Sequence, residues 1–158
     1  MYKLIVIMLL VCFVFAAFPV TVRADKPEVG IGLHIGWPTL LGFSVKGWAA
    51  PRFGLQGMGS RFSSGDASLT MLSGRVFYKL ATGRSVAPAI GVGGGVWMAS
   101  DDDDEETVPI FEFLLHFEHK WTENFRGDYE LGYYIVNFEE IDTDISGMAL
   151  GIGMHYFF

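Results

Sequence analysis

The C-terminal segment of this chain alternates without a break between large apolar residues and small ones. From Gly147 to Tyr156, one face carries only large apolar side chains and the other only glycine, alanine and histidine. Strict alternation is typical of a β-strand, because successive side chains of a strand point to opposite faces. Neither face carries Asp, Glu, Lys or Arg, so neither is suited to water. The segment therefore predicts a strand with lipid on one side and crowded packing on the other.

The same alternation recurs along the chain. It is equally clear over Val29–Trp37 and weaker in four further segments, and turn-forming residues separate these segments. Two more strands are needed to make the number even, as hairpins closed into a membrane barrel require. The predicted strands cover residues 29–37, 41–46, 54–62, 68–79, 89–98, 111–118, 128–135 and 147–158. We predict an all-β fold: a closed antiparallel transmembrane β-barrel of about eight strands with up-and-down topology.

A soluble barrel with an apolar interior is the alternative to a membrane barrel. Such a barrel must present charged and polar side chains to water. The segments 29–37, 89–98 and 147–158 contain no charged residue at all. The membrane barrel is therefore the favoured interpretation.

The N-terminus has the pattern of a secretory signal peptide. One positive charge at Lys3 precedes the unbroken apolar run Leu4–Phe18, and Val22-Arg23-Ala24 forms a small-x-small cleavage site. An uncleaved membrane anchor is the alternative, but the run is shorter than the roughly 20 residues that a spanning helix needs. We predict a cleaved signal peptide over residues 1–24 and one barrel domain over residues 25–158. The only cysteine, Cys12, lies in the removed segment, so the mature chain has no disulfide.

The charge balance excludes some partners. The chain carries 11 basic and 18 acidic residues, and removal of Lys3 and Arg23 makes it more acidic still. Nucleic acid is therefore excluded as a partner, since its phosphates need a basic face. A hydrophobic share of 51% also excludes an acidic disordered chain.

The signal peptide, the alternating strands and the terminal strand Ala149–Phe158 resemble the small eight-stranded outer-membrane proteins of the OmpA/OmpX/OmpW-like superfamily. In that group a terminal strand ending in Phe is the signal read by the barrel-assembly machinery. The resemblance implies that Tyr156 and Phe158 form this assembly signal. It also implies a place in the outer membrane of a Gram-negative bacterium, among outer-membrane lipid and lipopolysaccharide, with periplasmic chaperones as further partners during biogenesis. The first predicted outer loop, Pro38-Thr39, is too short for the long-loop adhesion roles of some relatives.

Charged residues on the inward faces predict an interior network. The interior of an eight-stranded barrel is just wide enough to be filled by side chains. Opposite charges there are expected to pair, because unpaired buried charge is costly. A proton or ion path is the alternative, and the inward glycines either leave a void or make room for large side chains opposite. The predicted network residues are Lys46, Arg75, Glu112, Glu118, Asp128 and Glu130, with His34, His116 and His155 on the same faces.

An acidic run marks one predicted outer loop. Clustered carboxylates suit Ca²⁺ or Mg²⁺, and bound cations would bridge to lipopolysaccharide phosphates. A solvated loop that binds nothing is the favoured alternative, and no other cofactor is predicted. The candidate metal ligands are Asp101, Asp102, Asp103, Asp104, Glu105 and Glu106, and a neighbouring outer loop adds Glu139, Glu140, Asp142 and Asp144.

Aromatic residues near the predicted strand ends suggest girdles at the two membrane interfaces. Trp37 and Trp97 fall near outer ends, whereas Trp48, Tyr78 and Trp121 fall near inner turns. We expect these five rings to lie on the lipid-facing surface.

Sequence motifs give little support to catalysis. No His-x-Ser motif accompanies Ser63, Ser64 and Asp66, and His116 and His119 point to opposite faces of a strand. We therefore predict a non-enzymatic barrel with a structural or interaction role in the envelope. A narrow pore or carrier for small hydrophobic or cationic molecules is the alternative, and a lipid-modifying enzyme is a third option. A continuous lumen would favour the pore, whereas a filled lumen would favour the structural role. A Ser–His contact at the outer edge would favour the enzyme.

Overall fold

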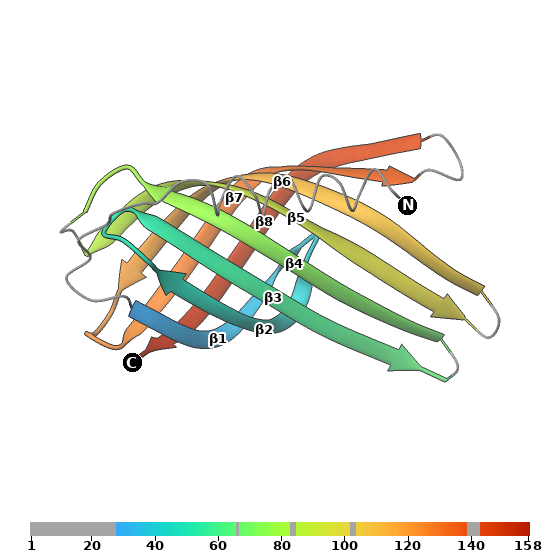
Figure 1. Cartoon of the computed structure of the whole chain (residues 1–158), viewed down its shortest axis with the longest axis horizontal. Coiled ribbons are helices and arrows are strands. Elements are labelled where there is room, and N and C mark those ends of the chain that lie inside the picture. Colours follow the sequence, from blue (N-terminus) through green and yellow to red (C-terminus); the bar gives the residue numbers. More distant parts are fainter. Residues whose placement is uncertain (1–27, 66, 83–84, 102–103, 139–142) are drawn as a thin grey trace.

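A computed structural model describes residues 28–65, 67–82, 85–101, 104–138 and 143–158. The predicted signal peptide lies outside the described residues. Each strand pairs antiparallel with the next, and the last pairs with the first, so the sheet closes into a barrel (Figure 1). The strands are β1 (Glu28–Trp37), β2 (Leu40–Trp48), β3 (Phe53–Ser64), β4 (Ala67–Lys79), β5 (Val86–Asp101), β6 (Asp104–Lys120), β7 (Phe125–Phe138) and β8 (Thr143–Phe157).

The predicted closed antiparallel barrel with up-and-down topology is confirmed, with eight strands. The two strands needed to make the number even are present as β3 and β4. No helix in the described part of the chain is long and apolar enough to cross a membrane.

The barrel has its apolar side chains outside and its polar ones inside. Large apolar residues such as Ile31, Phe113 and Ile152 are about half exposed on the outer wall. A soluble protein distributes these residue types the opposite way, so this wall is suited to lipid. The buried polar and charged side chains are His34, Ser44, Lys46, Gln56, Arg75, Lys79, Glu112, His116, Glu118, Arg126, Asp128, Glu130 and His155.

Two of the five predicted girdle residues lie inside the barrel instead. Trp48 is only 3% exposed, and Trp97 packs against the buried apolar cluster. The prediction was wrong because it used position along the strand and ignored alternation: Trp48 has the same parity as Lys46, and Trp97 the same parity as Gly95. Tyr78 and Trp121 are exposed, as expected. Trp37 is also about half exposed, but its ring lies against those of Trp97 and Tyr134 at the outer mouth.

The outer end of the barrel is uneven, because the β1–β2 hairpin is much shorter than the other three (Figure 1). β8 continues outward to Thr143 beyond Leu150, the residue that pairs with Trp37. Pro38 in the short turn is fully buried. The ring of Trp37 meets the rings of Trp97 and Tyr134 edge-on, at centroid distances of 5.7 and 6.1 Å. The short turn therefore packs into the mouth of the barrel.

Inward glycines make room for large side chains opposite them. A Cβ atom at Gly91 would lie 2.6 Å from the ring of Phe77, and one at Gly54 would lie 2.6 Å from the ring of Trp48. At Gly93 it would lie 2.8 Å from the side chain of Arg75. The sequence left open whether the inward glycines leave a void or make room for large side chains, and these three glycines make room for large side chains.

Replacing Gly91 with Val should destabilise the barrel, because Phe77 is fully buried and has no free space to move into. Overpacking of this kind costs about 1–3 kcal/mol of unfolding free energy. Gly57→Val is the matched control, since nothing lies within 4 Å of a Cβ at Gly57. Urea unfolding in detergent, followed by tryptophan fluorescence, measures both variants. Equal midpoints for the two variants would contradict this account of the inward glycines.

Candidate functional site: the barrel interior

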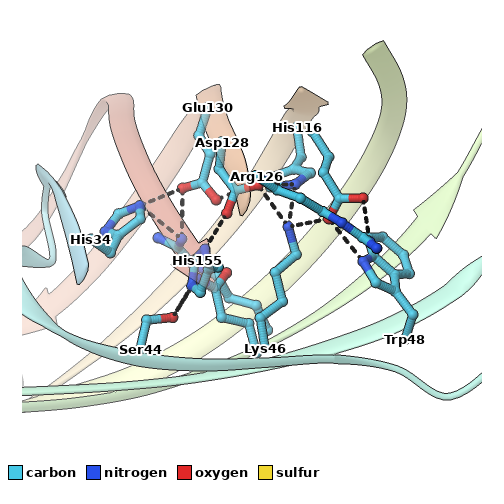
Figure 2. A network of polar contacts seen from close by, with 12 residues as sticks. His34, Ser44, Lys46, Trp48, His116, Arg126, Asp128, Glu130 and His155 are labelled. Carbon is cyan, nitrogen blue, oxygen red and sulfur yellow. Dashed lines mark hydrogen bonds and ion pairs between the residues drawn. The ribbon is translucent and has the colours of Figure 1, made fainter. Parts of the chain in front are cut away.

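The described interior holds four cationic and four carboxylate side chains, all buried. They come from β2, β4, β6 and β7, on the strand faces that alternation directs inward (Figure 2). With neutral histidines, the interior charges balance. The cations are Lys46, Arg75, Lys79 and Arg126, and the carboxylates are Glu112, Glu118, Asp128 and Glu130.

Arg75 joins two of the carboxylates. Its Nε and Nη2 donate to the two oxygens of Glu112, at 2.7 and 2.8 Å, which is a bidentate pair. Its Nη1 donates to Oε2 of Glu130 at 2.6 Å. The same Glu130 oxygen lies 2.9 Å from Nε2 of His34. One guanidinium thus holds β4, β6 and β7 together across the lumen.

Lys46 is the centre of a second group of contacts (Figure 2). Its Nζ lies 2.8 Å from Oδ1 of Asp128 and 3.1 Å from Oε2 of Glu118. The third contact, also at 2.8 Å, is with Nε2 of His116. Lys46 has no exposed surface, so these contacts replace its whole hydration shell.

Glu118 connects this group to the inner end of the barrel. Its Oε2 accepts a hydrogen bond from the indole of Trp48 at 2.8 Å. Its Oε1 accepts from Lys79 at 2.9 Å and from Arg126 at 3.3 Å. Arg126 also pairs with Glu28 near the start of β1, at 2.8 Å. The polar contacts therefore run from mid-barrel to the inner end without an unpaired carboxylate.

A serine, a histidine and an aspartate contact one another in the order found in the catalytic triad of a hydrolase. Nε2 of His155 is 2.8 Å from Oγ of Ser44, and its Nδ1 is 2.8 Å from Oδ2 of Asp128. All three side chains are buried inside the barrel. Gln56 donates a further hydrogen bond to Ser44 at 2.8 Å. Ser44 is buried and its oxygen already contacts both Gln56 and His155, so the arrangement is a hydrogen-bonded part of the packed interior.

The fold can be compared with solved structures. The N-terminal β-barrel domain of Pseudomonas aeruginosa OprF is 13% identical, with 85% of this chain and 98% of that chain covered and a TM-score of 0.59. Neisserial surface protein A is 16% identical, with 84% and 96% covered and a TM-score of 0.53. The fold is that of the small eight-stranded outer-membrane barrels. No family model matches the sequence, and no curated protein matches it.

The interior of the barrel is built from residues far apart in sequence. All six predicted network residues lie in the polar interior, as do His34, His116 and His155. The sequence analysis missed Lys79 and Arg126 as members of this network. Alternation could have identified both, since Lys79 has the parity of Arg75 in β4, and Arg126 that of Asp128 in β7.

The acidic run lies at the tip of the β5–β6 hairpin. Asp101, Glu105 and Glu106 are exposed there, while Asp102 and Asp103 lie outside the described residues. The neighbouring acids Glu139, Glu140 and Asp142 also lie outside them. Within the described part, the one group of possible metal ligands is instead inside the barrel. Binding of Ca²⁺ or Mg²⁺ at the acidic run stays a prediction.

The predicted assembly residues Tyr156 and Phe158 lie at the end of the chain and point outward, with 50% and 74% of their surface exposed. Their rings pack edge-on at a centroid distance of 5.6 Å. The backbone N–H of Phe158 donates to the carbonyl of Val29 at 3.0 Å. The terminal residue thus extends the β1–β8 seam, and its role as an assembly signal stays a prediction.

Neither serine predicted at the outer edge, Ser63 or Ser64, bonds to a histidine among the described residues, and Asp66 lies outside them. The Ser–His contact that the chain does make, Ser44 with His155, lies inside the barrel and away from the outer edge. The condition set for a lipid-modifying enzyme is therefore not met by the described residues.

Arg75→Met should strongly destabilise the barrel, because it leaves Glu112 and Glu130 buried without their cation. Removing one partner of a buried pair costs about 3–5 kcal/mol of unfolding free energy. Arg61→Met is the control, since Arg61 is exposed near the outer end of β3. Equilibrium unfolding in urea measures both variants in detergent. If Arg75→Met unfolds at the same urea concentration as Arg61→Met, the network does not stabilise the fold.

Proposed function

We propose that this chain is a closed outer-membrane barrel protein with a structural or interaction role in the cell envelope. The observation that carries this proposal is that buried side chains cross the lumen near its outer mouth, at its middle and near its inner end. Conduction needs a continuous path, and catalysis needs an accessible site. The described interior offers neither.

Three successive obstructions support a closed lumen. The buried Pro38 and the rings of Trp37, Trp97 and Tyr134 occupy the outer mouth. The ion-pair network fills the middle of the barrel. At the inner end the guanidinium of Arg126 lies 4.1 Å from the centre of the buried Phe157 ring.

The hollows that remain do not form a channel. One, lined by His34, Ser73 and Trp97 among others, has a volume of about 20 Å³, which is room for about one water molecule. Two larger hollows, of about 450 and 570 Å³, are lined by separate sets of residues at the outer and inner ends. Lys79, Glu118 and Arg126 of the network line the inner hollow, and the rest of the network separates it from the outer one.

The projecting hairpins support an interaction role. The β3–β4, β5–β6 and β7–β8 hairpins extend beyond the short β1–β2 turn (Figure 1). On the outer wall, apolar residues give way to Arg61, Thr70 and Thr107 as these hairpins extend. Exposed Asp101, Glu105 and Glu106 follow at the β5–β6 tip. Such tips suit contact with anionic lipopolysaccharide through divalent cations.

The purified protein, refolded into planar lipid bilayers, should give no stepwise conductance, because ions have no continuous path through the network. A general porin inserted under the same conditions is the positive control. Insertion of the barrel itself is checked by its protection from protease in lipid vesicles. Stepwise conductance from inserted protein would contradict the closed lumen and favour the alternative of a narrow pore.

The proposed location depends on the terminal strand. We expect the native chain in the outer-membrane fraction, with a gel mobility that shifts on boiling. Replacing Tyr156 and Phe158 with Asp should abolish both properties, because charge on the lipid-facing wall is unfavourable and the aromatic signal is lost. Tyr156→Phe with Phe158→Trp is the matched control and should behave like the native chain. Recovery of the native chain as a soluble periplasmic protein would contradict the proposal.

A further inference from the structure

The ammonium of Lys46 lies where a metal ion would lie in a three-ligand site. Ligand atoms of His116, Glu118 and Asp128 all lie within 4.8 Å of one another. Nζ of Lys46 is 2.8–3.1 Å from Nε2 of His116, Oε2 of Glu118 and Oδ1 of Asp128. One imidazole and two carboxylates are a donor set that suits divalent first-row metals such as Zn²⁺.

A second layer of contacts orients each of the three ligands, as it does around bound metals. Nδ1 of His116 lies 3.1 Å from Oε1 of Glu130, which leaves the lone pair of Nε2 directed at Lys46. Oδ2 of Asp128 contacts His155 at 2.8 Å, so that Oδ1 is left for Lys46. A carboxylate partner on the far nitrogen of a histidine is the usual support of a metal-ligating imidazole.

The same layer fixes Glu118. Its Oε1 accepts a hydrogen bond from Lys79 at 2.9 Å, which turns Oε2 towards Lys46. All three ligand side chains are at least nine-tenths buried. Asp128 therefore needs a cation at this point, since uncompensated buried charge is strongly unfavourable and Lys46 is its Lys or Arg partner among the described residues, whereas Glu118 also contacts Lys79 and Arg126.

We propose that His116, Glu118 and Asp128 form a divalent-metal site in which Lys46 is the resident cation. The tethered ammonium keeps metal out of the native barrel and makes the stability of its interior independent of divalent ions. Removing the ammonium makes the site available to Zn²⁺, and to Co²⁺ as a spectroscopic probe. This inference concerns the interior alone and does not depend on the proposed envelope role.

The test compares the full-length mature barrel with its Lys46→Ser variant, each refolded in detergent with Zn²⁺ or with a chelator. Serine removes the ammonium and leaves space for an ion. We expect the variant to bind one Co²⁺ or Zn²⁺ at least 100-fold more tightly than the native barrel. The urea midpoint of unfolding of the variant should rise with Zn²⁺ and fall with chelator. The midpoint of the native barrel should respond to neither.

Two further variants separate a metal site from a general effect of charge. Lys46→Met has no charge but fills the same space, so Zn²⁺ should not stabilise it. Lys46→Ser combined with His116→Ala should lose the tight binding, which distinguishes this site from metal bound by exposed carboxylates at the acidic run.

The proposal is overturned if Lys46→Ser binds metal no more tightly than the native barrel, or if its binding survives His116→Ala. It is also overturned if Lys46→Ser fails to refold and the yield of folded barrel is no higher with Zn²⁺ than with chelator. A native barrel that binds Zn²⁺ as tightly as the variant would show that Lys46 does not occupy the metal position.

Discussion

Charge balance among buried side chains governs the interior of this barrel. The wall satisfies its own backbone hydrogen bonds through closed strand pairing, and its outer face is apolar. Everything polar must therefore find its partners across a narrow lumen. Each of the four buried carboxylates contacts at least one buried cation, and Lys46 and Arg75 each contact two. Loss of Lys46 would leave Asp128 without a Lys or Arg partner among the described residues, and loss of Arg75 would leave Glu112 and Glu130 without one, which is strongly unfavourable for buried carboxylates. Glu118 differs, because it contacts Lys46, Lys79 and Arg126.

The same constraint explains the glycines and the closed lumen. Lysine and arginine side chains that reach across the barrel need space at the strand they approach. Gly93 provides that space beside Arg75 and Glu112, and Gly151 provides it beside His34 and Glu130. Large residues on one wall therefore face glycine on the other. This packing supports the proposed structural role over a pore.

The requirement for an even number of strands added two to the six that alternation predicted. Alternation assigns every residue of a strand to one face, because its period is two. It also identified six of the eight buried charges, and it would have identified Lys79 and Arg126 had it been followed to the strand ends. Trp48 and Trp97 were predicted on the lipid side because alternation was not applied to them. The contacts themselves were beyond sequence reasoning. Lys46 in β2 meets Asp128 in β7, which are not neighbouring strands, and such a contact depends on the closure and diameter of the barrel. The Ser44–His155 bond joins residues of β2 and β8 in the same way.

The Ser44, His155 and Asp128 arrangement shows why geometry has to be considered together with access. Its distances are those of a catalytic triad, yet catalysis also needs a place for the reacting atom about 3 Å from the nucleophile. Here that volume is occupied by the packed interior, and Gln56 already donates a hydrogen bond to the serine oxygen. Lys46 presents the converse case, with the position for a metal present but filled by the chain itself. Both groups have the donor arrangement of a functional site, and in both the packing of a charged lumen has taken the space that a ligand would use. The proposed interaction role therefore rests on the hairpins that extend beyond the β1–β2 turn, where Asp101, Glu105 and Glu106 are exposed.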